Sequence, residues 1–152
     1  MDSCRVAAIV ILATLELEAG RAGHGLSLVL RVTPLALSSG SLTLQAQTHM
    51  LIARCLLGGA PSPYPRRSSL QAAEVHLDKA VGILGGLEER EELKTAFHLS
   101  ALTANALGDV QKRDRAAEMF CKASVELDRG VGVLNQLCLA PQSALDATAH
   151  EP

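Results

Sequence analysis

Two segments of the sequence place one large apolar residue between two alanines, at the same offsets of four and three residues. These small–large–small triplets are Ala73, Leu77, Ala80 and Ala116, Phe120, Ala123. Offsets of four and three keep all three side chains on one face of an α-helix. On such a face the alanines let a second helix approach closely, and the large residue fills the space beside them. The triplets therefore predict closely packed helices, with Leu77 and Phe120 as packing residues.

The composition favours the same fold class. Hydrophobic residues make up 48% of the 152 residues and charged residues 20%, which is typical of one domain with a continuous core. Aromatic residues contribute only 2%, so Leu and Ala carry most of the apolar surface. Ala and Leu lead the helix-propensity ranking, whereas strands favour aromatic and β-branched residues. The net charge of −2 does not suggest the basic face of a nucleic-acid-binding protein, so no nucleic acid partner is expected.

Glycine, proline and charge divide the chain into six segments with helical patterns. The predicted helices cover residues 4–19, 24–37, 42–57, 68–84, 87–107 and 114–127. We expect Pro34 to end or kink the second helix, because proline cannot donate a backbone hydrogen bond. Ser68 is expected to cap the fourth helix, with Gln71 completing a capping box. After Gly108, residues 109–113 are expected to turn the chain.

The order of these six segments predicts one helical domain followed by a tail. Residues 1–138 are predicted to form helical repeats, about three helix pairs, and residues 139–152 a flexible polar tail. The segment over residues 58–69 holds three prolines and two glycines, which predicts a loop between the third and fourth helices.

Each triplet follows a helix that ends at glycine, in the segments "LLGG" and "ALGD". A first helix, a glycine stop and a second helix with small–large–small residues resemble tetratricopeptide repeats. The two triplets lie 43 residues apart, which is longer than the usual 34-residue repeat. A third, weaker copy is Gly25, Val29 and Val32. The predicted fold is all-α, with antiparallel helix pairs stacked as a tetratricopeptide-like α-solenoid; the alternative is another bundle of antiparallel α-hairpins.

The first helices of these pairs lack the Trp and Tyr of the tetratricopeptide pattern. Phe97, Ala101 and Ala104 stand at the corresponding positions. Phe97 is therefore expected to be a packing residue together with the two triplets.

No catalytic, cofactor-binding or metal-binding motif is recognisable. The five histidines have no histidine partner at an offset of four, and the sequence contains no glycine-rich phosphate-binding motif. Surface or packed imidazoles are the expected state of the histidines. We therefore expect no enzyme activity, no cofactor, no metal and no small-molecule substrate.

The cysteines and one apolar run indicate whether the chain is intracellular or secreted. The four cysteines are far apart and form no C-x-x-C pair, which favours packed, reduced thiols inside the cell over disulfides. Residues 6–15 form an apolar run that is too short to span a bilayer. Because Asp2 cancels the charge of Arg5, the run is less typical of a signal peptide than of a buried helix, although secretion stays an alternative.

Three serines in the loop segment are candidate phosphorylation sites. Ser62 precedes a proline, and Ser68 and Ser69 follow two arginines. Phosphate on Ser68 would lie at a helix N-terminus, where its negative charge stabilises the helix.

The segment over residues 93–137 resembles the C-terminal end of the family of anaphase-promoting complex subunit 5. The shared features are "KT" and "HL" in the first helix, "LG" at its end, and "RD" with Ala117 and Phe120 in the second helix. Glu126-Leu127 and Gly130-Val131, then Asn135 and Leu137, continue the likeness. Residues 24–58 resemble the preceding repeats more loosely.

This resemblance implies a non-catalytic scaffold subunit, or a fragment of one, in a ubiquitin ligase that acts in cell division. Its partners would be other protein subunits of the complex, in the nucleus and the cytoplasm, with no membrane partner. Phe97, Leu77 and Phe120 would hold the helical stack together. One alternative is an independent tetratricopeptide-repeat adaptor that binds peptide segments of a partner, and another is an α-helical enzyme.

Overall fold

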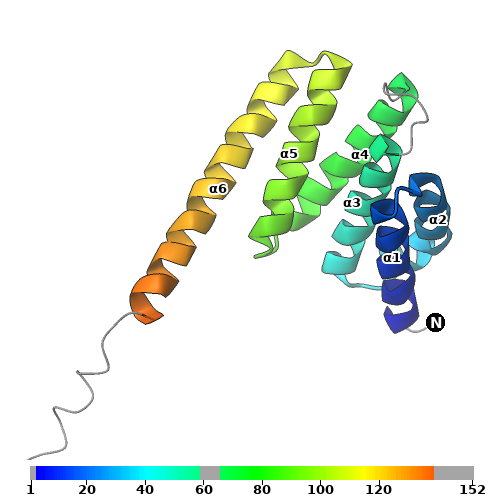
Figure 1. The fold of residues 1–152 in the computed structure, drawn as a ribbon, viewed down its shortest axis with the longest axis horizontal. Coiled ribbons are helices and arrows are strands. Elements are labelled where there is room, and N and C mark those ends of the chain that lie inside the picture. The colour runs from blue at the N-terminus through cyan, green and yellow to red at the C-terminus, as the bar shows by residue number, and fades with distance from the viewer. Residues whose placement is uncertain (1–2, 59–65, 139–152) are drawn as a thin grey trace, which may run out of the picture.

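In the computed structural model, residues 3–58 and 66–138 are described, and every regular element in these two ranges is an α-helix (Figure 1). The helices are α1 (Ser3–Glu18), α2 (Ala22–Ser38), α3 (Leu42–Gly58), α4 (Arg67–Leu84), α5 (Arg90–Leu107) and α6 (Val110–Cys138). The predicted all-α class is thus confirmed. The expected tail over residues 139–152 lies outside the described residues.

The helices pack mainly against their neighbours in the sequence. The most extensive contacts are within the pairs α1–α2, α3–α4 and α5–α6, and α2–α3 and α4–α5 connect one pair to the next. Beyond its sequence neighbours, α1 also contacts α3. Figure 1 shows α1 and α2 at one end of this array and α6 at the other. The chain therefore forms three successive helix pairs.

Two apolar clusters form the core, and α3 belongs to both. The first cluster joins α1, α2 and α3 and contains Val6, Val10, Ala13, Val29, Val32, Ala36, Leu44, Leu51, Ile52 and Cys55. The second joins α3, α4 and α5 and contains Ala46, Met50, Ala53, Ala73, Leu77, Ala80, Leu84 and Ala96. Two faces of α3 are buried because its neighbours lie on both sides. Every residue from position 48 to 53 is buried, although Thr48 and His49 in this run are polar.

Small residues set how closely the helices approach. In the second cluster Ala46, Ala53 and Ala96 lie with the fully buried Ala73 and Ala80, so the backbones of α3, α4 and α5 can come close together. Between α1 and α2 the contact is tighter still. A Cβ atom on Gly25 would lie only 2.8 Å from the backbone oxygen of Ala13. This position of α2 therefore requires glycine.

Pro34 was expected to end or kink the second helix, and the helix does not end there. α2 continues through Pro34 to Ser38, and the proline lies on the exposed side. Proline removes one backbone hydrogen bond from a helix. Val32 and Ala36, on either side of it, are both buried in the first cluster, so packing holds the helix on both sides of the missing bond.

The predicted span of the fourth helix differs from α4 by one residue at its start, but the expected cap is wrong. α4 begins at Arg67, with Arg66 before it in extended conformation and without a side-chain cap. The backbone N–H groups of Ser69 and Leu70 already donate to the Arg66 carbonyl, so Ser68 lies inside the first turn. The capping box of Ser68 and Gln71 therefore does not form.

The last helix is much longer than predicted. Gly108 adopts a left-handed conformation with φ of 82°, which alone reverses the chain between α5 and α6. Asp109 then accepts a hydrogen bond of 2.9 Å from the backbone N–H of Lys112, as a helix N-cap does. The predicted turn over residues 109–113 is thus wrong, and α6 runs to Cys138 rather than to Leu127.

Across the two described ranges, no helix combines the length and the apolar character that crossing a membrane requires.

The close approach at Gly25 can be tested with a second glycine of the same helix. Gly25→Ala should lower the free energy of unfolding by about 1–3 kcal/mol, because the new methyl group is forced against the backbone of α1. Gly23→Ala is the matched control, since a Cβ there meets nothing within 4 Å. Urea denaturation followed by circular dichroism measures both. Equal stability of the two variants would show that α1 and α2 are not in close contact at this point.

Candidate functional site

A groove crosses the first helix of all three pairs and is the candidate site of this chain. We name this cavity of about 390 Å³ the inner groove. It is lined by Val10, Ile11 and Thr14 of α1, by Ala46, Gln47, Met50, Leu51 and Arg54 of α3, by Leu84 of α4, and by Glu91, Glu92 and Thr95 of α5. The lining residues of α3 recur at offsets of three and four, so they form one face of that helix.

The polar groups of the inner groove are separated along its length. Thr43, near the start of α3, donates a hydrogen bond of 2.7 Å to Glu89, just before α5, so the two helices begin side by side. Glu91 and Glu92 therefore lie toward the N-terminal end of α3, whereas Arg54 lies in its last turns. Met50 and Leu51 form an apolar floor between them. The groove is thus acidic at one end, apolar in the middle and basic at the other.

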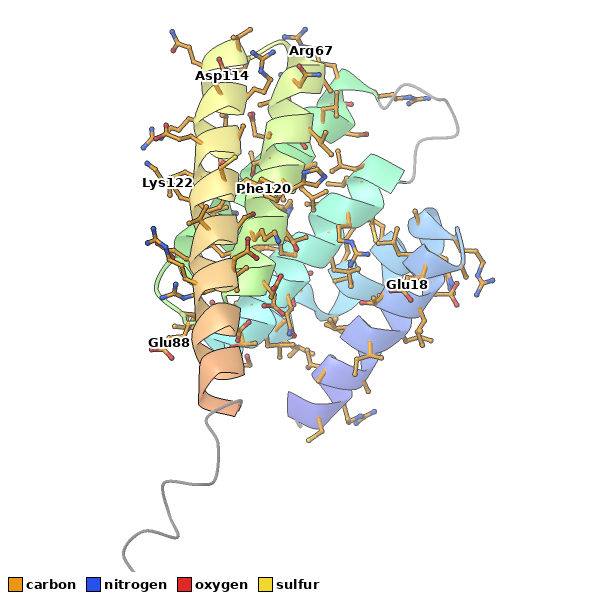
Figure 2. All side chains as sticks on the ribbon, turned by 60° about the vertical axis from the view of Figure 1, so that its left-hand side comes forward. Glu18, Arg67, Glu88, Asp114, Phe120 and Lys122 are labelled. Carbon is orange, nitrogen blue, oxygen red and sulfur yellow. The ribbon has the colours of Figure 1, made fainter. Side chains whose placement is uncertain are left out.

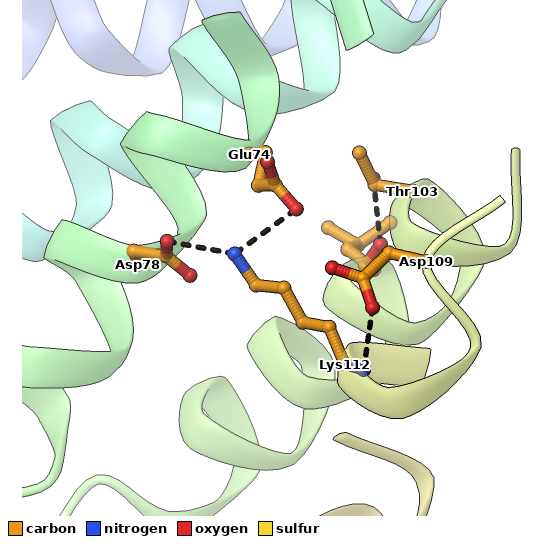
Figure 3. A network of polar contacts seen from close by, with 6 residues as sticks. Glu74, Asp78, Thr103, Asp109 and Lys112 are labelled. Atoms are coloured by element: carbon orange, nitrogen blue, oxygen red, sulfur yellow. Dashed lines mark hydrogen bonds and ion pairs between the residues drawn. The ribbon is translucent and has the colours of Figure 1, made fainter. Parts of the chain in front are cut away.

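A second cavity of about 650 Å³, the outer groove, lies among α4, α5 and α6. Its lining residues are Asp78, Val81, Phe97, Ser100, Asp109, Gln111, Lys112, Arg115, Ala116 and Met119. Figure 3 shows the ion pairs at its edge, where the Nζ atom of Lys112 lies 2.8 Å from Asp78 and 3.0 Å from Glu74. These bonds tie α6 to α4, two helices that are not neighbours in the sequence.

The charge of Lys112 is stabilised by this arrangement. Partial burial on its own lowers the pKa of Lys112, but the hydrogen bonds to Asp78 and Glu74 outweigh it, so the pKa is raised. Lys112 therefore stays protonated and acts as a structural cation, not as a general base. The outer groove consequently offers no activated amine for chemistry.

Ser100 is the unusual residue of the outer groove. Its Oγ atom is buried and has no hydrogen-bond partner among the described residues. Buried hydroxyls are normally paired, and an unpaired one costs about 1–3 kcal/mol. Phe97, one helical turn before it on α5, is only half-buried and lines the same groove.

Two histidines meet between α3 and α4, of which His49 is buried and His76 half-buried. The Nδ1 atoms of His49 and His76 lie 2.9 Å apart, so one ring donates a hydrogen bond and the other accepts it. Burial, followed by the positive charges of His76 and Lys79, lowers the pKa of His49 to about 4. Burial and Lys79 also lower the pKa of His76. Both rings are therefore neutral near pH 7, and no sequence pattern pointed to this pair.

The residues of the two triplets differ in burial. Ala73, Leu77 and Ala80 are fully buried in the second cluster. Ala116 and Ala123 are buried as well, but Phe120 is only half-buried. Its ring lies 5.6 Å from that of His98 and 5.8 Å from the Nζ atom of Lys94, so it packs against the side of α5 (Figure 2). Phe97 and Phe120 belong to neither core cluster.

The other sequence-based expectations have mixed outcomes. Ser62 lies outside the described residues. Ser68 is exposed and Ser69 half-buried, both in the first turn of α4. The expectation of packed thiols fits Cys55, which is buried and whose thiol pKa is raised by that burial, and it is wrong for the exposed Cys4 and Cys121.

Comparisons with known proteins identify no family for the chain. None of the protein-family models matches it, and none of the curated proteins is similar to it in sequence. Over residues 3–58 and 66–138, no group of three or more His, Cys, Asp or Glu side chains is placed to hold a metal ion.

The histidine pair makes the stability of the fold depend on pH. An unfolded histidine has a pKa near 6.5, so between about pH 6.5 and pH 4 the unfolded chain binds more protons than the folded one. The free energy of unfolding should therefore fall as the pH falls through this window, by about 2 kcal/mol at pH 5 from His49 alone. Urea denaturation at pH 7.5 and pH 5 measures the change.

The double variant His49→Leu/His76→Leu should lose most of this pH dependence, because both titrating rings are gone. His98→Gln serves as the control, since His98 is exposed on α5. If the free energy of unfolding of the wild type and of the double variant falls equally between the two pH values, the histidine pair is not the source of the pH dependence.

Proposed function

We propose that this chain is a non-catalytic scaffold that binds other proteins through stacked helix pairs. The observation that carries the proposal is the inner groove, because α1, α3 and α5 line it together. These are the first helices of three successive pairs. In repeat proteins of this kind, corresponding helices of successive repeats form one extended concave surface for binding. A tetratricopeptide-like stacking of the pairs is the arrangement that we propose.

The complex that we propose is the anaphase-promoting complex. The support for it is the resemblance of residues 93–137 to the C-terminal end of its subunit 5 family. This segment spans most of α5 and α6, with Gly108 as the stop between them. The chain would then join other subunits of the ubiquitin ligase rather than act on a substrate itself.

Affinity purification of the tagged chain from dividing cells, followed by mass spectrometry, tests this assignment. Other subunits of the anaphase-promoting complex should be recovered with the wild type. Leu77→Asp is the control, because a charge in the second cluster should unfold the stack and leave only non-specific partners. Recovery of no subunit of the complex, or the same recovery with Leu77→Asp, would refute the assignment.

A second function, an independent adaptor for peptide segments, is favoured by the charges of the inner groove. A bound segment would place apolar side chains on Met50 and Leu51, an acidic group at Arg54 and a basic group at Glu91 and Glu92. Opposite charges at two ends fix the direction in which a peptide lies, because reversing it would bring like charges together.

Selection from a displayed peptide library tests the adaptor function. Enriched peptides should carry a basic and an acidic residue on opposite sides of an apolar one. Arg54→Glu should weaken their binding at least about tenfold, whereas Arg31→Glu, at an exposed site on α2, should leave it unchanged. A library with no enriched sequence, or equal effects of the two substitutions, would speak against a peptide site in the inner groove.

A further inference from the structure

The buried hydroxyl that lines the outer groove behaves unlike other buried hydroxyls of the described helices. Thr48 and Thr103 donate hydrogen bonds of 2.7 and 2.8 Å to the backbone carbonyls four residues before them. Ser100 is only 8% exposed, yet its Oγ atom has no partner within residues 3–58 and 66–138. Its side chain can therefore turn toward the groove about χ1 without breaking a hydrogen bond. Unpaired buried groups are rare, and functional sites are where they are expected.

The turn at Gly108 determines which residues of α6 lie beside Ser100. α5 and α6 are joined by this turn and run antiparallel, side by side (Figure 1). Residues equally far from the turn are therefore at about the same level. Ser100 lies eight residues before Gly108, and Ala116 lies eight residues after it. Arg115 precedes the small Ala116 and lines the same groove. This level of the groove thus holds a hydroxyl and a guanidinium group.

One helical turn away, the lining of the outer groove is apolar. Phe97 and Met119 are each eleven residues from Gly108, so they lie at about the same level. Phe97 is half-buried and belongs to neither core cluster, and Met119 is exposed to 37%. Val81 adds apolar surface from α4. The groove therefore has a polar level and an apolar level, which are one turn apart.

Arg115 is the cation that remains available in this lining. Asp78 is bound to the Nζ atom of Lys112 at 2.8 Å, and Asp109 accepts a hydrogen bond from the backbone N–H of Lys112 (Figure 3). Arg115 is exposed and takes part in no ion pair with the described residues. Glu118, one turn further along α6, is already paired with a lysine at 2.7 Å. The polar level is therefore complementary to a negative group, and guanidinium groups bind carboxylates especially well.

We propose that the outer groove binds a small carboxylic acid with an apolar tail, such as a fatty acid. Its carboxylate accepts hydrogen bonds from Arg115 and from the Ser100 hydroxyl, and its tail lies along Phe97 and Met119. The cavity of about 650 Å³ is in the size range of pockets for single organic ligands. The ligand gives Ser100 the partner that it lacks in the free chain. This site is independent of the proposed scaffold function, because the two grooves share no lining residue.

Fluorescence titration with cis-parinaric acid, a fatty acid whose emission rises in apolar surroundings, tests the site. The chain should bind the acid with a dissociation constant of about 10 μM or lower. The methyl ester has the same tail without the charge, and it should bind at least about tenfold more weakly. No saturable binding of the acid at about 50 μM protein, or equal affinities for acid and ester, would overturn the proposal.

Substitution of Arg115 tests the contact with the carboxylate. Arg115→Gln should raise the dissociation constant of the acid at least about tenfold and change that of the ester less than about twofold, because the ester carries no charge. Arg129→Gln is the matched control, since Arg129 is exposed on the same helix and does not line the groove. An equal loss in the two variants, or no loss with Arg115→Gln, would contradict the assignment.

Substitution of Met119 tests the position of the tail. Met119→Glu should raise the dissociation constants of both acid and ester at least about tenfold, because it places a charge at the apolar level. Val125→Glu is the control, since Val125 is exposed to 49% on α6 and lies outside the groove. Circular dichroism verifies that both variants are helical. Unchanged binding to Met119→Glu would refute the proposed position.

Ser100→Ala distinguishes a ligand-binding hydroxyl from one that is merely unpaired. The variant should unfold at a higher urea concentration than the wild type, because a buried unpaired hydroxyl destabilises the free chain. It should also raise the dissociation constant of the acid at least about threefold. A more stable variant with unchanged affinity for the acid would show that Ser100 does not contact the ligand and would overturn its part in the site.

Discussion

Close contact between helix backbones through small residues is the constraint on which this fold depends. With aromatic residues at 2% of the sequence, few aromatic side chains are available to fill wide gaps between helices. The interior is filled by bringing the helices together instead, at Gly25 between α1 and α2 and at Ala73 and Ala80 between α4 and its neighbours. Because interiors are packed as densely as crystals, such contacts tolerate little change in volume.

The fold class and most helices could be predicted from the sequence because their determinants are local. Leu and Ala content, glycine stops and apolar periodicity act within a few residues. Errors arose where tertiary contacts outweighed a local signal, as at Pro34, which lies between two buried residues of α2. A second error was the predicted turn over residues 109–113. The left-handed Gly108 reverses the chain in a shorter space, so α6 begins earlier than expected.

The candidate sites were harder to predict because their residues are distant in sequence. His49 and His76 are 27 residues apart, and they meet only because the register of α3 against α4 aligns them. Lys112 reaches Glu74 and Asp78 across helices that are not sequence neighbours. In the sequence, Lys112 cannot be distinguished from a solvent-exposed lysine in the first turn of a helix, because its partners lie on another helix. Phe120 shows the opposite case, since its pattern suggested a core residue and its ring is half-exposed.

The two core clusters share α3, and this arrangement determines how the chain comes apart. Leu51, Ile52 and Cys55 hold α3 to α1 and α2, while Ala46 and Ala53 hold it to α4. Loss of α3 order would remove the support of both clusters at once, so the helices that share them, α1 to α5, should unfold as one cooperative unit. Most of α6 lies outside both clusters and packs mainly on α5. Its amide hydrogens should therefore exchange with solvent earlier than those of α3, through openings that leave the rest folded.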